Sequence, residues 1–232
     1  MPAAAERLRP LCRALSLALL VSGTAGMAGV AGAAPPAVQA QANTQAPAAG
    51  VQAMRHWVMV SRDNEGLPFV VIDKRDARLW LFDAAGRLAG QTPVLLGAAH
   101  GDVSVPGIGE RPMHDIRPEE RTTPAGRFVA EAGRNAQGED IFWVDYDAAV
   151  SMHRVRATVP AEKRLQRLAT PTPSDNRISY GCINVPVAFY DRHLRPMFQP
   201  ARGVVYLMPE TVPSSSLFTP VNVGRAPKVP AR

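Results

Sequence analysis

Short apolar runs separated by turn residues are the feature of this sequence that most constrains its fold. Six such runs have the length and composition of β-strands: Phe69–Asp73, Arg78–Phe82, Leu88–Leu96, Gly126–Glu131, Ile141–Tyr146 and Gly203–Met208. Helical patterns are few, one over residues 161–168 behind Pro160 and one from Pro186 up to Arg195. The pattern predicts a mainly β, sandwich-like or barrel-like domain with one or two short helices.

The N-terminus has the pattern of a secretory signal peptide. Three arginines precede the apolar run 14–21, and cleavage-like triplets follow at 31–33 and 40–42. The run is too short to span a bilayer, which needs about 20 apolar residues. Cys12 precedes the apolar run, so it is not in the place of a lipid-attachment cysteine. We expect a periplasmic or secreted chain with no stable membrane insertion after cleavage; an uncleaved anchor is the alternative.

Composition divides the chain into four segments. Residues 1–42 hold the signal peptide and the start of a spacer, and residues 43–67 are expected to be a flexible linker. The strand-rich domain covers 68–208, and 209–232 has the pattern of a loose, Pro-rich C-terminal tail. The length of the domain is sufficient for one hydrophobic core.

Charge argues against nucleic acid as a partner. The formal net charge is +6, and the signal region, with three arginines and one glutamate, accounts for +2 of it. The rest is mildly basic, contains no dense Lys/Arg block, and only 6% of all residues are aromatic. This balance suits contact with anionic polymers of the cell envelope.

Cys182 is the only cysteine that remains once the signal peptide is removed. It cannot form an intramolecular disulfide, and a free thiol is a liability in an oxidising compartment. The sequence around it is Ser179-Tyr180-Gly181-Cys182-Ile183-Asn184, with His153 upstream. A histidine can take the thiol proton and stabilise the thiolate, so the pair predicts a cysteine nucleophile; inert packing of the thiol is the alternative.

These residues resemble the catalytic domain of L,D-transpeptidases, also called the YkuD domain. The resemblance covers 68–208 and includes the cysteine segment, the upstream histidine, the hairpin 70–82 and the Thr-Pro-x-Gly turn at Thr123–Gly126. It implies a mainly β sandwich that displays the cysteine in a groove. Tyr180 stands where the family usually has histidine, and Arg154 where it usually has glycine. The segment 154–178 is longer than usual and predicts a helical flap at the rim of the site.

The resemblance implies a cofactor-free cysteine acyltransferase that acts on peptidoglycan stem tetrapeptides. Cys182 would release the terminal D-Ala and form a thioester, with His153 as general base and backbone N–H groups at Gly181 and Cys182 stabilising the oxyanion. An amine of a second stem as acceptor gives a 3→3 cross-link, which serves cell-wall biogenesis and cell shape. A lysine of an envelope protein is a second acceptor, and water would make the protein an L,D-carboxypeptidase. Carbapenems are expected to label the thiol.

The remaining candidate residues have open roles. Ser179 orients the cysteine loop or is a turn residue, Asn184 braces that loop or contacts substrate, and the Tyr180 ring packs or its hydroxyl replaces the usual histidine. Arg154 and Arg177 hold a substrate carboxylate or are solvated charges. A backbone carbonyl near Arg154 is the expected partner that orients His153.

No metal site is predicted. The sequence contains no His-x-x-x-His or Cys-x-x-Cys pattern, and His100 and His114 lie in a Gly/Pro-rich loop in which solvation is the usual role.

Two other classes of function remain. One is a sortase-like transpeptidase, which also uses cysteine, histidine and arginine on a β scaffold. The other is a peptidoglycan-binding relic without turnover.

Overall fold

The computed structural model describes residues 46–200 and 202–218. The predicted signal peptide, Cys12, the cleavage triplets and the end of the C-terminal tail lie outside these residues. In the part of the chain that is described, no helix is long and apolar enough to cross a membrane.

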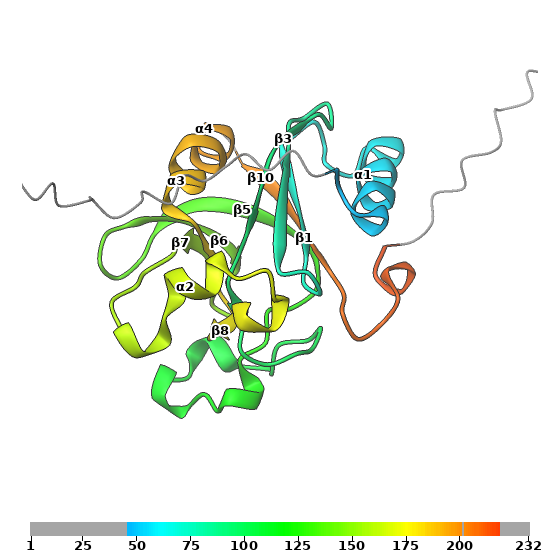
Figure 1. Cartoon of the computed structure of the whole chain (residues 1–232). Coiled ribbons are helices and arrows are strands. Elements are labelled where there is room, and N and C mark those ends of the chain that lie inside the picture. Colours follow the sequence, from blue (N-terminus) through cyan, green and yellow to red (C-terminus); the bar gives the residue numbers. More distant parts are fainter. Residues whose placement is uncertain (1–45, 201, 219–232) are drawn as a thin grey trace, which may run out of the picture. The chain divides into compact units, whose positions relative to one another are not determined.

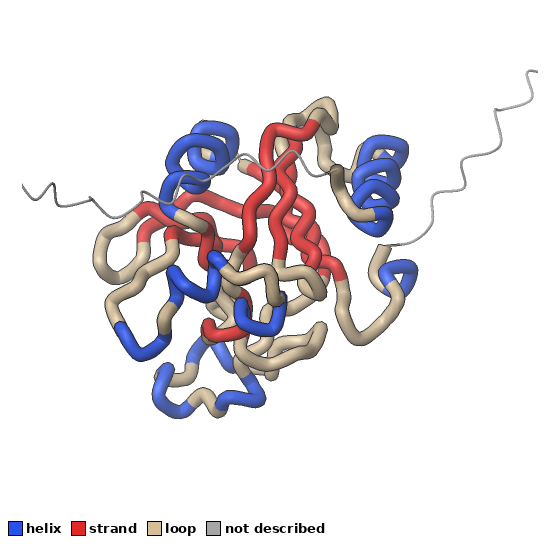
Figure 2. Tube along the Cα trace, in the orientation of Figure 1, coloured by secondary structure: helices blue, strands red, loops and turns tan. Residues whose placement is uncertain are grey.

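One eight-stranded mixed sheet dominates the structure and confirms the mainly β prediction (Figures 1 and 2). Its order is β3-β2-β1-β10-β5-β6-β7-β9, and a separate two-stranded ladder joins β4 to β8. The strands are β1 Phe69–Asp73, β2 Arg78–Phe82, β3 Leu88–Pro93, β4 Leu96–Gly97, β5 Gly126–Arg134, β6 Asp140–Asp145, β7 Val150–Arg154, β8 Arg177–Ser179, β9 Ile183–Val185 and β10 Gly203–Met208. The α-helices are α1 Ala49–Ser61, α2 Arg164–Ala169, α3 Val187–Phe189 and α4 Arg195–Phe198.

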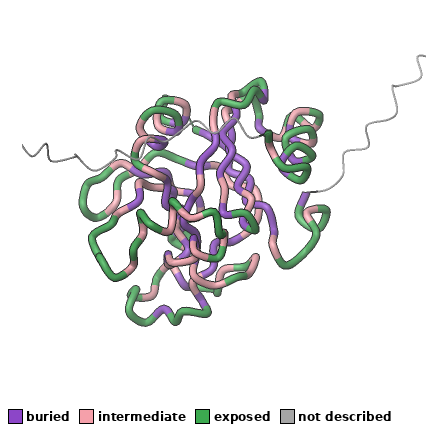
Figure 3. The backbone as a smooth tube through the Cα atoms, viewed as in Figure 1, coloured by how far each residue is buried: buried purple, intermediate pink, exposed green. Residues whose placement is uncertain are grey.

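The central strands are buried on both faces, which explains their continuous apolar sequences. Alternate residues of β1 face two different cores: Val70 and Ile72 join the larger core with β6, β7 and β9, whereas Phe69 and Val71 pack beneath α1. The two ends of the sheet therefore enclose the larger core as the layers of a sandwich do, with α3 and α4 packed against it. Buried backbone is concentrated in these strands and exposed backbone in the loops (Figure 3).

The N-terminal linker prediction is wrong for the residues that the structure describes. Instead of a flexible spacer, residues 49–61 form α1, which packs on the sheet through Val51, Met54 and Val58. These residues recur at helical spacing and make a buried stripe. The Ala- and Gln-rich stretch before the helix extends into its first turns and conceals the stripe, and the helix begins without a side-chain cap or an acidic first turn.

The first residues of the predicted C-terminal tail also belong to the folded domain. Phe218 is buried in the core beneath α1, and Glu210 lies in a buried ion-pair cluster described below. The prediction of a loose tail over 209–232 is therefore wrong at Glu210 and Phe218, and residues 219–232 lie outside the described part of the chain.

The helical flap predicted after His153 is present in two pieces. Residues 160–162 form a 3₁₀ turn, and α2 follows at Arg164–Ala169. Lys163 separates them with a left-handed φ of 50°, a conformation that a regular helix does not contain.

The helix predicted from Pro186 to Arg195 extends further than expected. A π-helical turn, Tyr190–Leu194, connects α3 to α4, and α4 continues through Pro196 to Phe198. Proline lacks the N–H that an α-helix needs, and the widened turn before it accommodates that loss.

The predicted third strand, Leu88–Leu96, ends early, and its remainder changes partners. β3 ends at Pro93, which has no N–H to continue the ladder. Leu95 then exchanges backbone hydrogen bonds with Asn184, and β4 pairs in parallel with β8. This crossing brings the end of the N-terminal hairpin to the cysteine segment.

Met54→Ala is expected to lower the free energy of unfolding by about 2–5 kcal/mol, because truncation of a buried Met leaves a cavity between α1 and the sheet. Urea denaturation followed by circular dichroism measures the change. His56→Ala, on the exposed side of the same helix, is the control and is expected to leave the midpoint unchanged. Equal midpoints for the two variants would contradict the packing of α1 on the sheet.

Candidate active site

Parallel pairing of β7 with β9 brings the predicted histidine and cysteine segments together. The register aligns Met152 with Ile183 and His153 with Asn184, so Cys182 lies beside Ser151. Because side chains alternate along a strand, Ser151 and His153 project on the same face while Met152 is buried in the core. The Ser151 N–H and Oγ lie 3.5 and 3.6 Å from the Cys182 Sγ.

A backbone carbonyl orients the His153 ring, as the sequence predicted. The Nδ1 of His153 lies 2.7 Å from the carbonyl oxygen of Arg154. A carbonyl can only accept, so Nδ1 carries the proton and Nε2 of the neutral ring is free to accept one. The ring hydrogen-bonds to Cys182, which places an acceptor at the thiol.

The surroundings of Cys182 favour its thiolate form. Burial raises the pKa of the thiol, but the hydrogen bond and charge of His153 and the two Ser151 contacts lower it by more. The pKa of Cys182 therefore lies below its usual value, which is the condition for a nucleophilic cysteine. The carbonyl of Ala149 lies 3.6 Å from the Sγ and is an alternative acceptor for the thiol hydrogen when the hydrogen does not point at His153.

Ser179 braces the cysteine loop. Its Oγ donates to the carbonyl of Cys182 at 2.6 Å and accepts the N–H of Gly181 at 3.1 Å. Thr123, from the Thr-Pro-x-Gly turn, holds the loop from the other side, because its hydroxyl donates to the Gly181 carbonyl at 2.7 Å and accepts the N–H of Gly97 at 2.9 Å. The loop therefore has little freedom to move relative to β4 and β5.

Gly181 is required by backbone conformation rather than as an oxyanion donor. Its φ is +124°, and a Cβ at this position would lie 2.9 Å from the Thr122 carbonyl oxygen. The expectation that its N–H stabilises an oxyanion does not hold, because that N–H is donated to Ser179. Within the described residues, the Cys182 N–H donates no hydrogen bond and remains the candidate donor of the loop.

Tyr180 packs against an arginine. The guanidinium carbon of Arg121 lies 3.8 Å from the centre of the Tyr180 ring. Arg121 is itself fixed by two hydrogen bonds to the carbonyl of Ile116. Of the two roles left open for Tyr180, the structure shows ring packing.

The two arginines proposed to hold a substrate carboxylate are engaged elsewhere. The guanidinium of Arg154 pairs with Asp140 at 3.0 Å and Asp191 at 2.6 Å, over the Tyr190 ring. Arg177 is buried against Glu210 and donates to the carbonyl of Lys74 at 2.6 Å. Both side chains are held by acidic partners inside the fold, so these predictions are corrected to a structural role.

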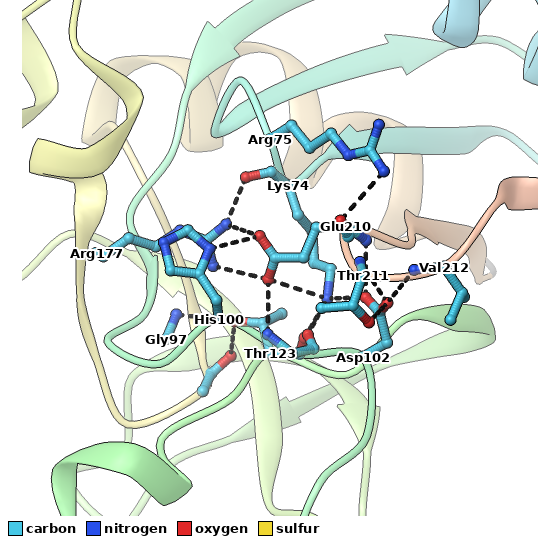
Figure 4. Close-up of polar contacts among 12 residues, drawn as sticks. Lys74, Arg75, Gly97, His100, Asp102, Thr123, Arg177, Glu210, Thr211 and Val212 are labelled. Carbon is cyan, nitrogen blue, oxygen red and sulfur yellow. Dashed lines mark hydrogen bonds and ion pairs between the residues drawn. The ribbon is translucent and has the colours of Figure 1, made fainter.

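A buried ion-pair cluster joins Lys74 and Arg177 to Asp102 and Glu210 (Figure 4). The Lys74 side chain is fully buried, and its Nζ lies 2.8 Å from Asp102 and 3.5 Å from Glu210. It also donates to the carbonyl of Thr123 at 2.9 Å. Lys74 therefore fixes the backbone of Thr123, and the hydroxyl of Thr123 in turn fixes the cysteine loop.

The carboxylates of the cluster are stabilised as anions. Burial raises the pKa of Glu210, but the Gly101 N–H, His100 and the charges of Arg177 and Lys74 lower it by more, so it lies below its usual value. The pKa of Asp102 is also low, because its hydrogen bonds to Lys74 and to the Thr211 segment outweigh the effect of burial.

An open cavity of about 410 Å³ is lined by residues 102–107, the start of β5 and the turn after β6. Its walls are mostly apolar and include three carboxylate residues: Asp102, Asp145 and Asp147. Ala148 also lines it and precedes Ala149, whose carbonyl contacts the Cys182 Sγ. Of the three carboxylates, Asp102 is paired with Lys74, so Asp145 and Asp147 are the acidic residues of this wall that the cluster does not neutralise.

The histidines of the 97–118 loop have no metal-binding arrangement. His100 is mostly exposed and lies 3.0 Å from Glu210, and His114 is exposed beside Asp115. The described part of the chain holds no group of three or more His, Cys, Asp or Glu side chains that fits a metal ion.

Several residues of the site were not identified from the sequence. Ser151 could have been found from the sequence, because apolar Val150 and Met152 alternate with polar Ser151 and His153 as in a β-strand. Lys74 and Glu210 lie far apart in sequence, and no local pattern connects them. Arg164 of α2 had none either, yet it donates to the Asn184 amide at 2.5 Å.

No protein-family model and no curated protein sequence matches the chain. Among solved structures, it is similar to the catalytic domain of an L,D-transpeptidase from E. faecium, determined by NMR. The identity is 18%, the match covers 60% of this chain and 95% of that one, and the TM-score is 0.34. A function for this chain therefore depends on the geometry of the Cys182 site.

His153→Ala is expected to raise the pKa of the Cys182 thiol and to slow its alkylation at pH 7, because the variant loses the hydrogen bond and charge that stabilise the thiolate. The rate of reaction with iodoacetamide, measured from pH 5 to 10 by mass spectrometry, gives both quantities. His56→Ala is the control, since it lies on an exposed helix face. An unchanged pH profile for His153→Ala would contradict the pairing of this ring with the thiol.

Glu210→Gln is expected to make stability less sensitive to acid. Since the folded pKa of Glu210 is depressed, its contribution is complete above the unfolded value of about 4.3 and is lost as pH falls through the folded pKa. At pH 7 the variant should lose roughly 3–5 kcal/mol, the range for breaking a buried pair, because the buried Arg177 loses its acidic partner even though Asp102 still neutralises Lys74.

Urea denaturation at pH 7, 5, 4 and 3 tests the Glu210 prediction. Glu119→Gln, at an exposed carboxylate, is the control and should follow the parent protein at each pH. A Glu210→Gln variant that loses stability with acid as steeply as the parent would contradict the depressed pKa.

Proposed function

We propose that this protein is a cysteine acyltransferase of the L,D-transpeptidase type that acts on peptidoglycan stem tetrapeptides. The observation that carries the proposal is a thiol of lowered pKa against a histidine whose other nitrogen is fixed by a backbone carbonyl. The nucleophile Cys182, the base His153 and the carbonyl of Arg154 that orients the base are thus connected by successive hydrogen bonds. The choice of peptidoglycan as substrate comes from the motif resemblance and belongs to the proposal.

In the proposed first half-reaction, Nε2 of His153 takes the thiol proton, and the Cys182 sulfur attacks the carbonyl before the terminal D-Ala. The tetrahedral intermediate collapses when His153 returns the proton to the amine of D-Ala, which leaves. The acyl group stays on Cys182 as a thioester.

The Cys182 N–H is the proposed oxyanion donor. It lies at the reacting residue and donates to no acceptor among the described residues. Ser179 and Thr123 fix the loop that carries it, so little reorganisation accompanies the reaction. One donor of this kind is typically worth about 3 kcal/mol of barrier.

In the second half-reaction an amine attacks the thioester and His153 takes its proton, which restores the thiol as the new amide forms. Asp145 and Asp147 of the cavity would attract a cationic acceptor, such as the side chain of a diamino acid or an envelope-protein lysine, which loses a proton to solvent before its neutral amine attacks. Water in the same place would give L,D-carboxypeptidase activity. The predicted signal peptide would deliver the enzyme to the periplasm, where these substrates are found.

Residues 43–232 incubated with a disaccharide-tetrapeptide are expected to release D-Ala and to form a cross-linked dimer, detected by mass spectrometry. Cys182→Ala is expected to abolish both products while keeping the circular dichroism spectrum, because the residue lies in a loop. A carbapenem should add its mass to the parent protein and not to this variant.

Each result of that experiment selects among the candidate functions. D-Ala release without dimer would indicate carboxypeptidase activity or a protein acceptor. Turnover that persists in Cys182→Ala would overturn the nucleophile. A parent protein with neither D-Ala release nor a carbapenem adduct would favour a binding relic, and cleavage of a sorting-motif peptide would favour a sortase.

A further inference from the structure

We infer that Arg164 is a positioning residue for the nucleophile, acting on the cysteine loop through the amide of Asn184. The inference rests on the proposed function for the importance of Cys182 but not for the geometry of its loop. Arg164 lies in α2, within the long segment between His153 and the cysteine loop.

The guanidinium of Arg164 is held in place from both sides. Its Nη1 donates to the Asn184 Oδ1 at 2.5 Å, and its Nε donates to the Glu162 Oε2 at 2.6 Å. The side chain is only 13% exposed. A charge-assisted hydrogen bond in this setting is stronger than a neutral one and is weakly screened by solvent.

Asn184 connects that guanidinium to the residue that carries the thiol. Its side chain is 1% exposed, and its Nδ2 donates to the Cys182 carbonyl at 3.3 Å. Its backbone N–H and carbonyl both pair with Leu95. The backbone is therefore fixed, and rotation of the side-chain amide is the freedom that remains.

Arg164 removes that freedom. The amide nitrogen faces a carbonyl, so its oxygen needs a donor, and Arg164 supplies it. Without Arg164 the buried oxygen would lack a partner, and a rotation that satisfied it elsewhere would withdraw the donor from Cys182. An unpaired buried acceptor is costly, so the amide would have reason to move.

Asn184 acts on the nucleophile through its hydrogen bond to the backbone carbonyl of Cys182. That carbonyl accepts from Ser179 at 2.6 Å and from Asn184 at 3.3 Å, and together these donors set the peptide plane that follows the thiol-bearing residue. Release of one donor changes the direction of the Sγ relative to His153. The long segment thereby influences a thiol that Arg164 does not touch.

The rate and pH dependence of Cys182 alkylation by iodoacetamide test the inference without any peptidoglycan substrate. Arg164→Ala is expected to slow alkylation at pH 7 by roughly tenfold, the equivalent of about one hydrogen bond, and to raise the apparent pKa of the thiol. Arg164→Lys should restore much of the rate, since its ammonium can still donate to the Asn184 amide.

Two variants of the same helix separate this contact from helix stability. Leu165→Ala removes an exposed side chain and should leave alkylation unchanged. Arg167→Ala removes hydrogen bonds to the Glu162 and Asp175 carbonyls, within the segment itself, and should have a much smaller effect than Arg164→Ala. Circular dichroism establishes that each variant is folded.

A double-mutant cycle of Arg164→Ala with Asn184→Ala gives the decisive result. If Arg164 acts through Asn184, the double variant is expected to be no slower than Asn184→Ala alone. Additive effects, a parent-like profile for Arg164→Ala, or an equal loss in Arg167→Ala would each overturn the inference. A protein that fails to release D-Ala would refute the proposed function and leave this alkylation result standing.

Discussion

The buried ammonium of Lys74 must be neutralised and hydrogen-bonded by the loops around the site. A charge without exposed surface is tolerated only when its neighbours neutralise it and accept its protons. Here those neighbours are Asp102, Glu210 and the carbonyls of Gly101 and Thr123, which come from segments far apart in sequence. By binding these groups, Lys74 fixes the loop after β4, the segment after β10 and the turn before β5. A side chain that is not itself part of the Cys182 site therefore holds the loops around that site in place.

The sheet was predictable because its strands carry local signals. β1, β2 and β10 have the predicted bounds, since apolar runs ended by turn residues admit few other structures. The linker prediction failed at α1 because an Ala- and Gln-rich stretch extends into the first turns of the helix, and only Val51, Met54 and Val58 form its buried stripe. The short β8 and β9 have too few residues for a periodic signal, and tertiary pairing alone defines them.

The contact between Cys182 and His153 was more predictable than the surroundings of the pair. The residue types of Cys182 and His153 were sufficient to identify them as candidates. The backbone carbonyl that orients the histidine was expected because no carboxylate lies nearby in the sequence. The roles of the arginines were not predictable, because a guanidinium suits a substrate carboxylate and an internal one equally well. Only the fold shows that Arg154 forms ion pairs with Asp140 and Asp191.

The place of β10 in the sheet has a consequence for how the chain reaches its native state. β10 lies between β1 and β5, so within the eight-stranded sheet it joins β1–β3 to β5, β6, β7 and β9. A ribosome delivers β10 after every other strand of the described sheet, and both halves emerge without the neighbour they share. Pairing of such distant segments raises contact order and slows folding. The nascent chain therefore stays open until its final strand is made, and a truncation before residue 203 would leave two half-sheets with exposed edges rather than a smaller version of the domain.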